Sequence, residues 1–226
     1  GYRQAKVNNK VVSEIGSLEE LRSIEPSIPT LDEVIELTKG RLILQTHLVW
    51  AEGKNEESAR QLVELIYRHS IWDKVIVAAV FEKDLENINR FAAAKGITIS
   101  TGTSEDPAET TIEQVIEKAY RTRTVWIGSD IQDAINNPER ISKIKEAGFK
   151  AAAWGRFTTS KESENALKTG VDLIGVFNPT VLEAVKNNAA SLQYIQSLND
   201  IVSGKSECGF DYAAVVMMTD DEVTRV

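Results

Sequence analysis

The chain has 226 residues, close to the roughly 250 residues of a typical single α/β barrel. Hydrophobic residues make up 42% and charged residues 27% of it, a globular composition that excludes a disordered or collagen-like chain. The 34 acidic and 26 basic side chains leave a net charge of −8, which repels phosphate backbones, so no nucleic-acid partner is expected.

In chain order, the first predicted elements are two helices that begin with capping boxes. Ser17 is followed three residues later by Glu20, and Thr30 is followed by Glu33 in the same way. Further helical segments end at glycines, which can take the left-handed conformation that closes a helix. These glycines are Gly40, Gly96, Gly148 and Gly170.

Short β-branched runs alternate with the helical segments along the chain. This alternation is typical of repeated βα units around a parallel sheet. We therefore predict a TIM-type (β/α) barrel in one domain over residues 1–226, with the first barrel strand not identified. The predicted strands are Leu42 to Leu48, Val75 to Phe81, Ile97 to Thr101, Thr124 to Ile127, Lys150 to Trp154, Asp172 to Phe177 and Tyr212 to Met217.

Several segments resemble the glycerophosphodiester phosphodiesterases, in the superfamily of phospholipase-C-like phosphodiesterases. The likeness begins with Ile-Pro-Thr-Leu-Asp-Glu-Val-Ile at 28–35 and Lys-Gly at 39–40. It continues through 72–77, 147–154 and Gly-Val-Asp-Leu-Ile at 170–174, and ends with Asn178-Pro179. The resemblance implies a TIM barrel, and in that family the barrel hydrolyses deacylated phospholipids.

The order of the family's segments differs in this chain. Residues 209–221 resemble a block that precedes the Ile-Pro-Thr-Leu segment in the family, so the family's N-terminal part, about 190–226, stands at the C-terminus. We therefore expect a circularly permuted member, or a unit cut from a tandem array. A hairpin at Asp220-Asp221 would then continue into residues near Gly1, with Val226 and Gly1 within about 8 Å, two peptide lengths. The missing initiator Met fits a processed or excised chain.

The catalysis implied by the resemblance needs a divalent cation held by carboxylates, and two histidines as general acid and base. At the family's paired acids this chain has Ala214 and Val216, and its histidine-aspartate pair falls near Tyr2 and Arg3. A further metal-binding glutamate aligns with His47. We therefore expect no catalytic residues, no bound metal and no cofactor.

The residues that follow the strands gather at one end of a barrel, which we call the mouth, and form a candidate pocket there. Three of them have a second interpretation: His47 as a core or hydrogen-bonded residue, Trp154 as core packing, and Asp130, with Ser129, as the N-cap of the next helix. The candidate residues are His47, Glu82, Asp130, Trp154 and Arg156.

Outside the mouth, His69 is expected on the surface at a helix end, where a cation is favourable to the helix dipole. Cys208 is the single cysteine, which excludes an intrachain disulfide and a Cys-x-x-Cys redox pair. No apolar run approaches the roughly 18 residues of a membrane helix, so no membrane span is expected.

The leading functional hypothesis is a non-catalytic glycerophosphodiesterase-like barrel that serves as a structural, assembly or binding module. The expected partners are copies of the same chain, joined in a precursor or by donation of residues 212–226, and a small ligand in the mouth. The alternative is an active metal-dependent phosphodiesterase with a site rebuilt around His47, Glu82, Asp130 and Trp154.

Overall fold

The computed structural model describes residues 6–7, 10–11, 17–24, 26, 29–39, 43–48, 55–104, 111–155, 159–176 and 213–215. In chain order the strands are β1 (Lys6–Val7), β2 (Lys10–Val11), β3 (Ile43–Leu48), β4 (Val75–Ala79), β5 (Ser100–Ser104), β6 (Trp126–Asp130), β7 (Lys150–Gly155), β8 (Leu173–Val176) and β9 (Ala213–Val215). The helices are α1 (Leu18–Ile24), α2 (Leu31–Thr38), α3 (Asn55–His69), α4 (Glu82–Ala94), α5 (Ile112–Thr122), α6 (Ile131–Asn136), α7 (Pro138–Glu146) and α8 (Ser160–Lys168).

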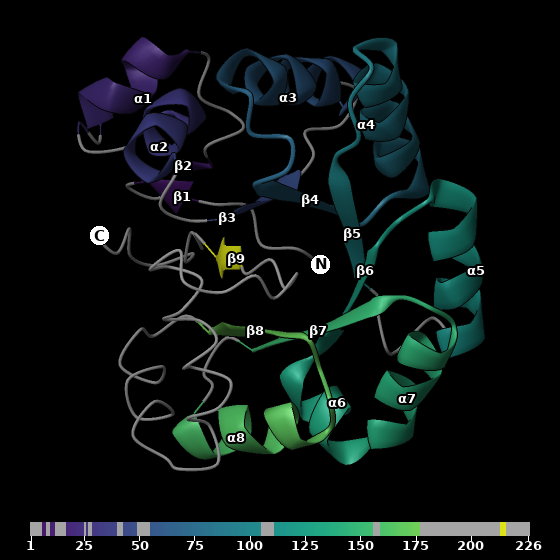
Figure 1. Ribbon diagram of the computed structural model, residues 1–226. Helices are drawn as coiled ribbons and strands as arrows, with labels where there is room; N and C mark the ends of the chain where they lie inside the picture. The colour runs from purple at the N-terminus through teal and green to yellow at the C-terminus, as the bar shows by residue number, and fades with distance from the viewer. Residues whose placement is uncertain are drawn as a thin grey trace, which may run out of the picture.

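A curled parallel sheet of seven strands, in the order β8-β7-β6-β5-β4-β3-β9, forms the centre of the molecule. Strands β3 to β8 follow one another in space as in sequence, and the helices between them lie on the outer side of the curl (Figure 1). This order confirms the predicted TIM-type α/β fold, because each helix returns the chain to the start of the next parallel strand.

Both faces of the sheet are packed. The outer face meets the helices through side chains such as Val77, Ile127 and Ala153, each with no measurable exposure. The inner face, which lines the curl, carries a second cluster of five buried residues. Side chains alternate between the faces along each strand, which is why continuous apolar runs were the signal for these strands. The inner cluster is Ile43, Ile76, Trp126, Ala152 and Leu173.

The predicted helix ends are confirmed where they are described. Thr30 accepts a hydrogen bond from the backbone N–H of Glu33, and the Glu33 carboxylate accepts one from the N–H of Thr30, which completes a capping box. Ser17 accepts from the N–H of Glu20 at the start of α1. Gly96, Gly148 and Gly170 have φ of 69°, 87° and 89°, which any other residue would adopt only with strain. Gly40 lies outside the described residues.

Two strands lie C-terminal to their predicted positions: β6 is Trp126–Asp130 where Thr124 to Ile127 was predicted, and β5 differs in character as well. The apolar segment Ile97 to Thr101 was expected to be a strand, but β5 is the polar run Ser100–Ser104. Its Thr101 and Thr103 are buried against the helices, and Gly102 faces the inner side. Hydrophobicity could not indicate this strand, because here hydroxyl side chains occupy the buried outer positions.

The last described strand, β9, lies at the edge of the sheet and pairs with β3 in parallel, with Ala214 opposite Leu44. A segment far away in sequence therefore continues the sheet next to β3 (Figure 1). The predicted hairpin at Asp220-Asp221, the positions of Gly1 and Val226, and Cys208 lie outside the described residues. In the part of the chain that is described, no helix is long and apolar enough to span a bilayer.

The capping box gives a prediction for acid stability. Hydrogen bonds from Arg22 and Thr30 lower the pKa of Glu33 from 4.5 to about 2. A lowered pKa stabilises the fold above the ordinary value, and the contribution is lost as pH falls from about 4.5 toward 2. We expect Glu33→Gln to lose this contribution, so the difference in unfolding free energy between wild type and variant should shrink over that interval.

Urea unfolding followed by circular dichroism at several pH values measures the difference. The single variant Arg22→Met is the companion, because it removes the largest cause of the lowered pKa and leaves the carboxyl in place. A difference between wild type and Glu33→Gln that stays constant from pH 5 to pH 2 would contradict the assignment.

Candidate functional site

Small residues line the inner face of the sheet toward the mouth. The register of the parallel strands places His47 of β3 beside Ala78 of β4, and Ala78 beside Gly102 of β5. On the other side, Asp130 of β6 lies beside Trp154 of β7. Ala78 and Gly102 carry little or no side chain, as does Gly128 of β6, so one large residue can spread over its neighbours.

That residue is Trp154. A Cβ built on Gly128 would lie 1.8 Å from Cη2 of the Trp154 indole, so the ring lies directly on the bare backbone of β6. On the opposite flank, a Cβ on Gly175 would come within 3.1 Å of the Trp154 Cβ. Trp154 packs against the inner cluster and is itself partly buried, so it both fills the core and bounds the space in the mouth.

Little space remains beneath the ring. The gap beside Trp154 holds about 10 Å³, about the room of a single water molecule. Its lining is apolar apart from Gln45 of β3 and Thr103, and the Gln45 Oε1 atom has no hydrogen-bond partner in the described part of the chain. Trp126 fills the layer toward the other end of the barrel, where its indole N–H donates to Ser100 Oγ at 3.2 Å.

His47 lies near the end of β3, and its side chain is exposed. The expectation of a core position is therefore wrong. Although the ring reaches solvent, the protein around it lowers the pKa of His47 by desolvation, which favours the neutral imidazole. The alternation along β3 places it on the same side as Gln45, two residues earlier.

Asp130 has the role that the sequence offered as its second interpretation. Its carboxylate accepts a hydrogen bond of 2.8 Å from the backbone N–H of Gln132 and caps α6, which confirms the predicted N-cap. The exposed Asp130 is still the acidic side chain that the register brings next to Trp154.

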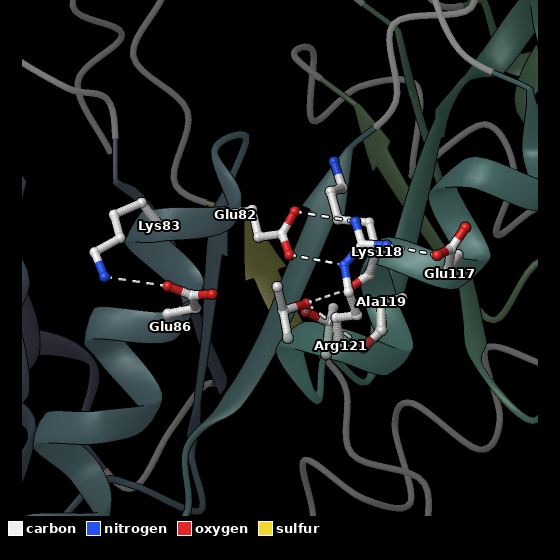
Figure 2. Close-up of polar contacts among 9 residues, drawn as sticks. Glu82, Lys83, Glu86, Glu117, Lys118, Ala119 and Arg121 are labelled. Carbon is white, nitrogen blue, oxygen red and sulfur yellow. Dashed lines mark hydrogen bonds and ion pairs between the residues drawn. The ribbon is translucent and has the colours of Figure 1, made fainter.

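Glu82 is turned toward the helix layer. Both of its carboxylate oxygens accept hydrogen bonds from Arg121 of α5, at 2.9 and 3.1 Å, and Arg121 also binds Glu117 (Figure 2). The hydrogen bonds from Arg121 lower the pKa of Glu82, so it is ionised and paired. The structure therefore brings Trp154 and Asp130 together, leaves His47 three strands away from Asp130, and joins Glu82 to α5. Arg156 lies outside the described residues.

A cation that the sequence did not indicate lies at the strand ends. Lys118 of α5 donates to the backbone carbonyls of Val80 and Ser104, each at 3.4 Å. These carbonyls follow β4 and end β5, so the ammonium group bridges two strands at the mouth end. Helix periodicity gave no signal for it, since a half-buried lysine looks like any solvated one in sequence.

The residues described at the mouth do not fit a divalent cation. Calcium and magnesium need several oxygen ligands, chiefly carboxylates. Within the described residues there is no group of three His, Cys, Asp or Glu side chains that could hold a metal ion. Of the described candidate carboxylates, Asp130 is engaged with the N-terminus of α6 and Glu82 with Arg121.

No family model matches the chain, and no curated protein matches its sequence. The fold, in contrast, is similar to that of solved structures. A protein of Galdieria sulphuraria assigned to the glycerophosphodiester phosphodiesterases has a TM-score of 0.65 at 18% identity, over 76% of this chain and 70% of that one. The glycerophosphodiester phosphodiesterase of Thermotoga maritima has a TM-score of 0.61 at 15% identity, over 83% and 78%.

A third similar structure is an Oleispira antarctica phosphodiesterase in complex with the product sn-glycerol-3-phosphate, with a TM-score of 0.58 at 20% identity. The match covers 71% of this chain and 62% of that one. The chain thus has a TIM-barrel fold like that of the glycerophosphodiester phosphodiesterases. At these identities the likeness establishes the fold, and function must be argued from the site.

The contact between Trp154 and Gly128 gives the second prediction. Gly128→Ala should destabilise the protein by about 1–3 kcal/mol, because the new methyl group forces the indole out of its position. In a Trp154→Ala background the same change should cost much less, since the obstructing ring is gone. Urea unfolding of both single variants and the double variant measures this coupling, and additive effects of the two changes would refute the contact.

Proposed function

We propose that the chain is a non-catalytic, glycerophosphodiesterase-like barrel that serves as a structural and assembly module. The observation that carries the proposal is the Trp154 indole lying on Gly128, because it fills the inner face at the level where a barrel enzyme needs room for substrate.

The polar groups around the mouth support the same proposal. Metal-assisted phosphodiester hydrolysis needs carboxylates that are free to bind a cation, together with a general acid and base. Asp130 and Glu82 are both committed to structural contacts. Desolvation lowers the pKa of His47 and so favours the neutral ring, and a neutral imidazole is a poor substitute for a carboxylate toward calcium or magnesium.

The proposal predicts that the purified chain does not hydrolyse glycerophosphocholine when calcium or magnesium is added. Release of glycerol phosphate should stay at the level of a heat-denatured sample, and isothermal titration should detect no binding of either ion. The matched variant is His47→Ala, which should behave like wild type in both assays. Metal-dependent turnover that His47→Ala abolishes would support the alternative of an active site rebuilt around His47, and would overturn the proposal.

The assembly part of the proposal is supported by β9. This strand is the last one in the described part of the chain, yet it pairs in parallel with β3, at the position where the family resemblance places an earlier strand. A strand that is separate in sequence from the neighbour it pairs with can be supplied by its own chain or by a second copy. We propose that β9 is the element through which copies of this chain join, as a permuted unit or as a unit of a tandem array.

Self-association should therefore depend on β9. Native mass spectrometry of wild type at rising concentration should show dimers and larger species, and two differently tagged preparations should form mixed species. Ala214→Pro should reduce these species at least severalfold, because proline removes a backbone donor from the pairing with β3. Ala151→Pro in β7 controls for a general loss of sheet structure. A wild-type chain that stays monomeric at every concentration would contradict this role.

A further inference from the structure

His69 is a buried titratable side chain that the proposed function does not use. It is the last residue of α3 and is 8% exposed, so the expected surface position is wrong. Its Nε2 lies 2.7 Å from Asp32 Oδ1, and its Nδ1 lies 2.8 Å from Glu36 Oε1. Asp32 and Glu36 are one turn apart on α2, so the imidazole ring bridges the two helices.

A neutral imidazole ring cannot donate a hydrogen bond to both carboxylates. A neutral imidazole carries one N–H donor and one lone pair, whereas the imidazolium carries two donors. If the ring is neutral and donates to Asp32, the lone pair of Nδ1 faces a carboxylate oxygen at 2.8 Å. Only the doubly protonated ring attracts both carboxylates.

The surrounding charges do not replace that second proton. From α3, Arg68 also binds Asp32 Oδ1, at 2.7 Å. From α2, Glu33 adds a further negative charge, which Arg22 of α1 pairs. Hydrogen bonding from His69 is the largest cause that lowers the pKa of Asp32, followed in the same direction by the charge of Arg68. Glu36 has Nδ1 of His69 as its described ion-pair contact, so losing the proton affects this carboxylate most.

The helix held by His69 covers part of the core. Ile35 of α2 is 1% exposed and packs in the cluster that contains Leu44 of β3. Leu31 and Val34 pack against the same cluster. Loosening α2 from α3 would therefore expose apolar surface at the start of the sheet, next to the strand that pairs with β9.

We propose that His69 is a proton-dependent clamp that fastens α2 to α3 when the ring is doubly protonated and releases it when the ring loses a proton. Histidine is the side chain that ordinarily changes charge between about pH 5 and pH 8, so these two pH values are the ones to compare. The result is a pH-sensitive switch at the N-terminal side of the barrel, independent of whether the mouth has a catalytic site.

Hydrogen exchange of backbone amides tests the clamp in the intact chain. Protection factors, which are corrected for the intrinsic effect of pH on exchange, are measured for α2 and for α4 at about pH 5 and pH 8. For wild type we expect the protection of α2 to fall by about three- to tenfold with rising pH, the size of one ordinary net hydrogen bond. The protection of α4 should not change.

Two variants identify His69 as the origin. In Glu36→Gln the new amide can donate to the Nδ1 lone pair of a neutral ring, so α2 should stay equally protected at both pH values. In His69→Gln the titrating group is gone, so the protection of α2 should be low and independent of pH. Glu113→Gln on α5 removes the same charge far from α2 and should behave like wild type.

The hydrogen-exchange results either support or overturn the clamp. A wild-type fall that both variants abolish and Glu113→Gln retains supports the clamp. A protection of α2 that does not change with pH in wild type, or a fall that persists in Glu36→Gln, overturns it. If His69→Gln does not fold, Glu36→Gln alone decides, because it leaves the buried ring in place.

Discussion

The contact between the Trp154 indole and the bare backbone of Gly128 determines what the inside of this barrel can contain. A parallel sheet that curls on itself must fill its inner face, and most barrels do so with layers of branched aliphatic side chains. Here the ring of Trp154 covers Gly128 of β6, and Gly175 of β8 lies against the Trp154 Cβ. Among the described residues, the gap beneath this ring holds about 10 Å³.

The charges of the molecule are used mainly to join helices to one another. Glu82 at the start of α4 binds Arg121 of α5, and Lys143 of α7 binds Glu113 of α5. Exposed ion pairs of this kind contribute little stability individually. They do determine which carboxylates remain available to bind a metal ion. A carboxylate that already binds a guanidinium is a weak candidate for a metal ligand. Glu82, which binds Arg121, is such a carboxylate.

The two histidines show that local sequence context does not determine burial. His47 follows apolar residues in a strand and was placed in the core as one interpretation, yet its side chain is exposed at the mouth. His69 stands among polar residues at a helix end and was placed on the surface, yet it is buried between α2 and α3. A local sequence pattern predicts which face of a helix or strand is buried. The burial of a residue at the end of an element depends instead on which neighbouring element packs over it.

The sequence by itself determined the fold class, the order of the strands from β3 to β8 and the ends of helices, because these depend on short-range periodicity and on capping residues such as Thr30 and Gly148. It also identified the capping role of Asp130, for which the local residues suffice. Only the tertiary structure decided that β5 is polar, that Glu82 turns to Arg121, and that Trp154 lies on Gly128. The last two depend on partners about 25 to 40 residues away in the chain, and the identity of such a partner is fixed by packing between elements, which no local pattern records.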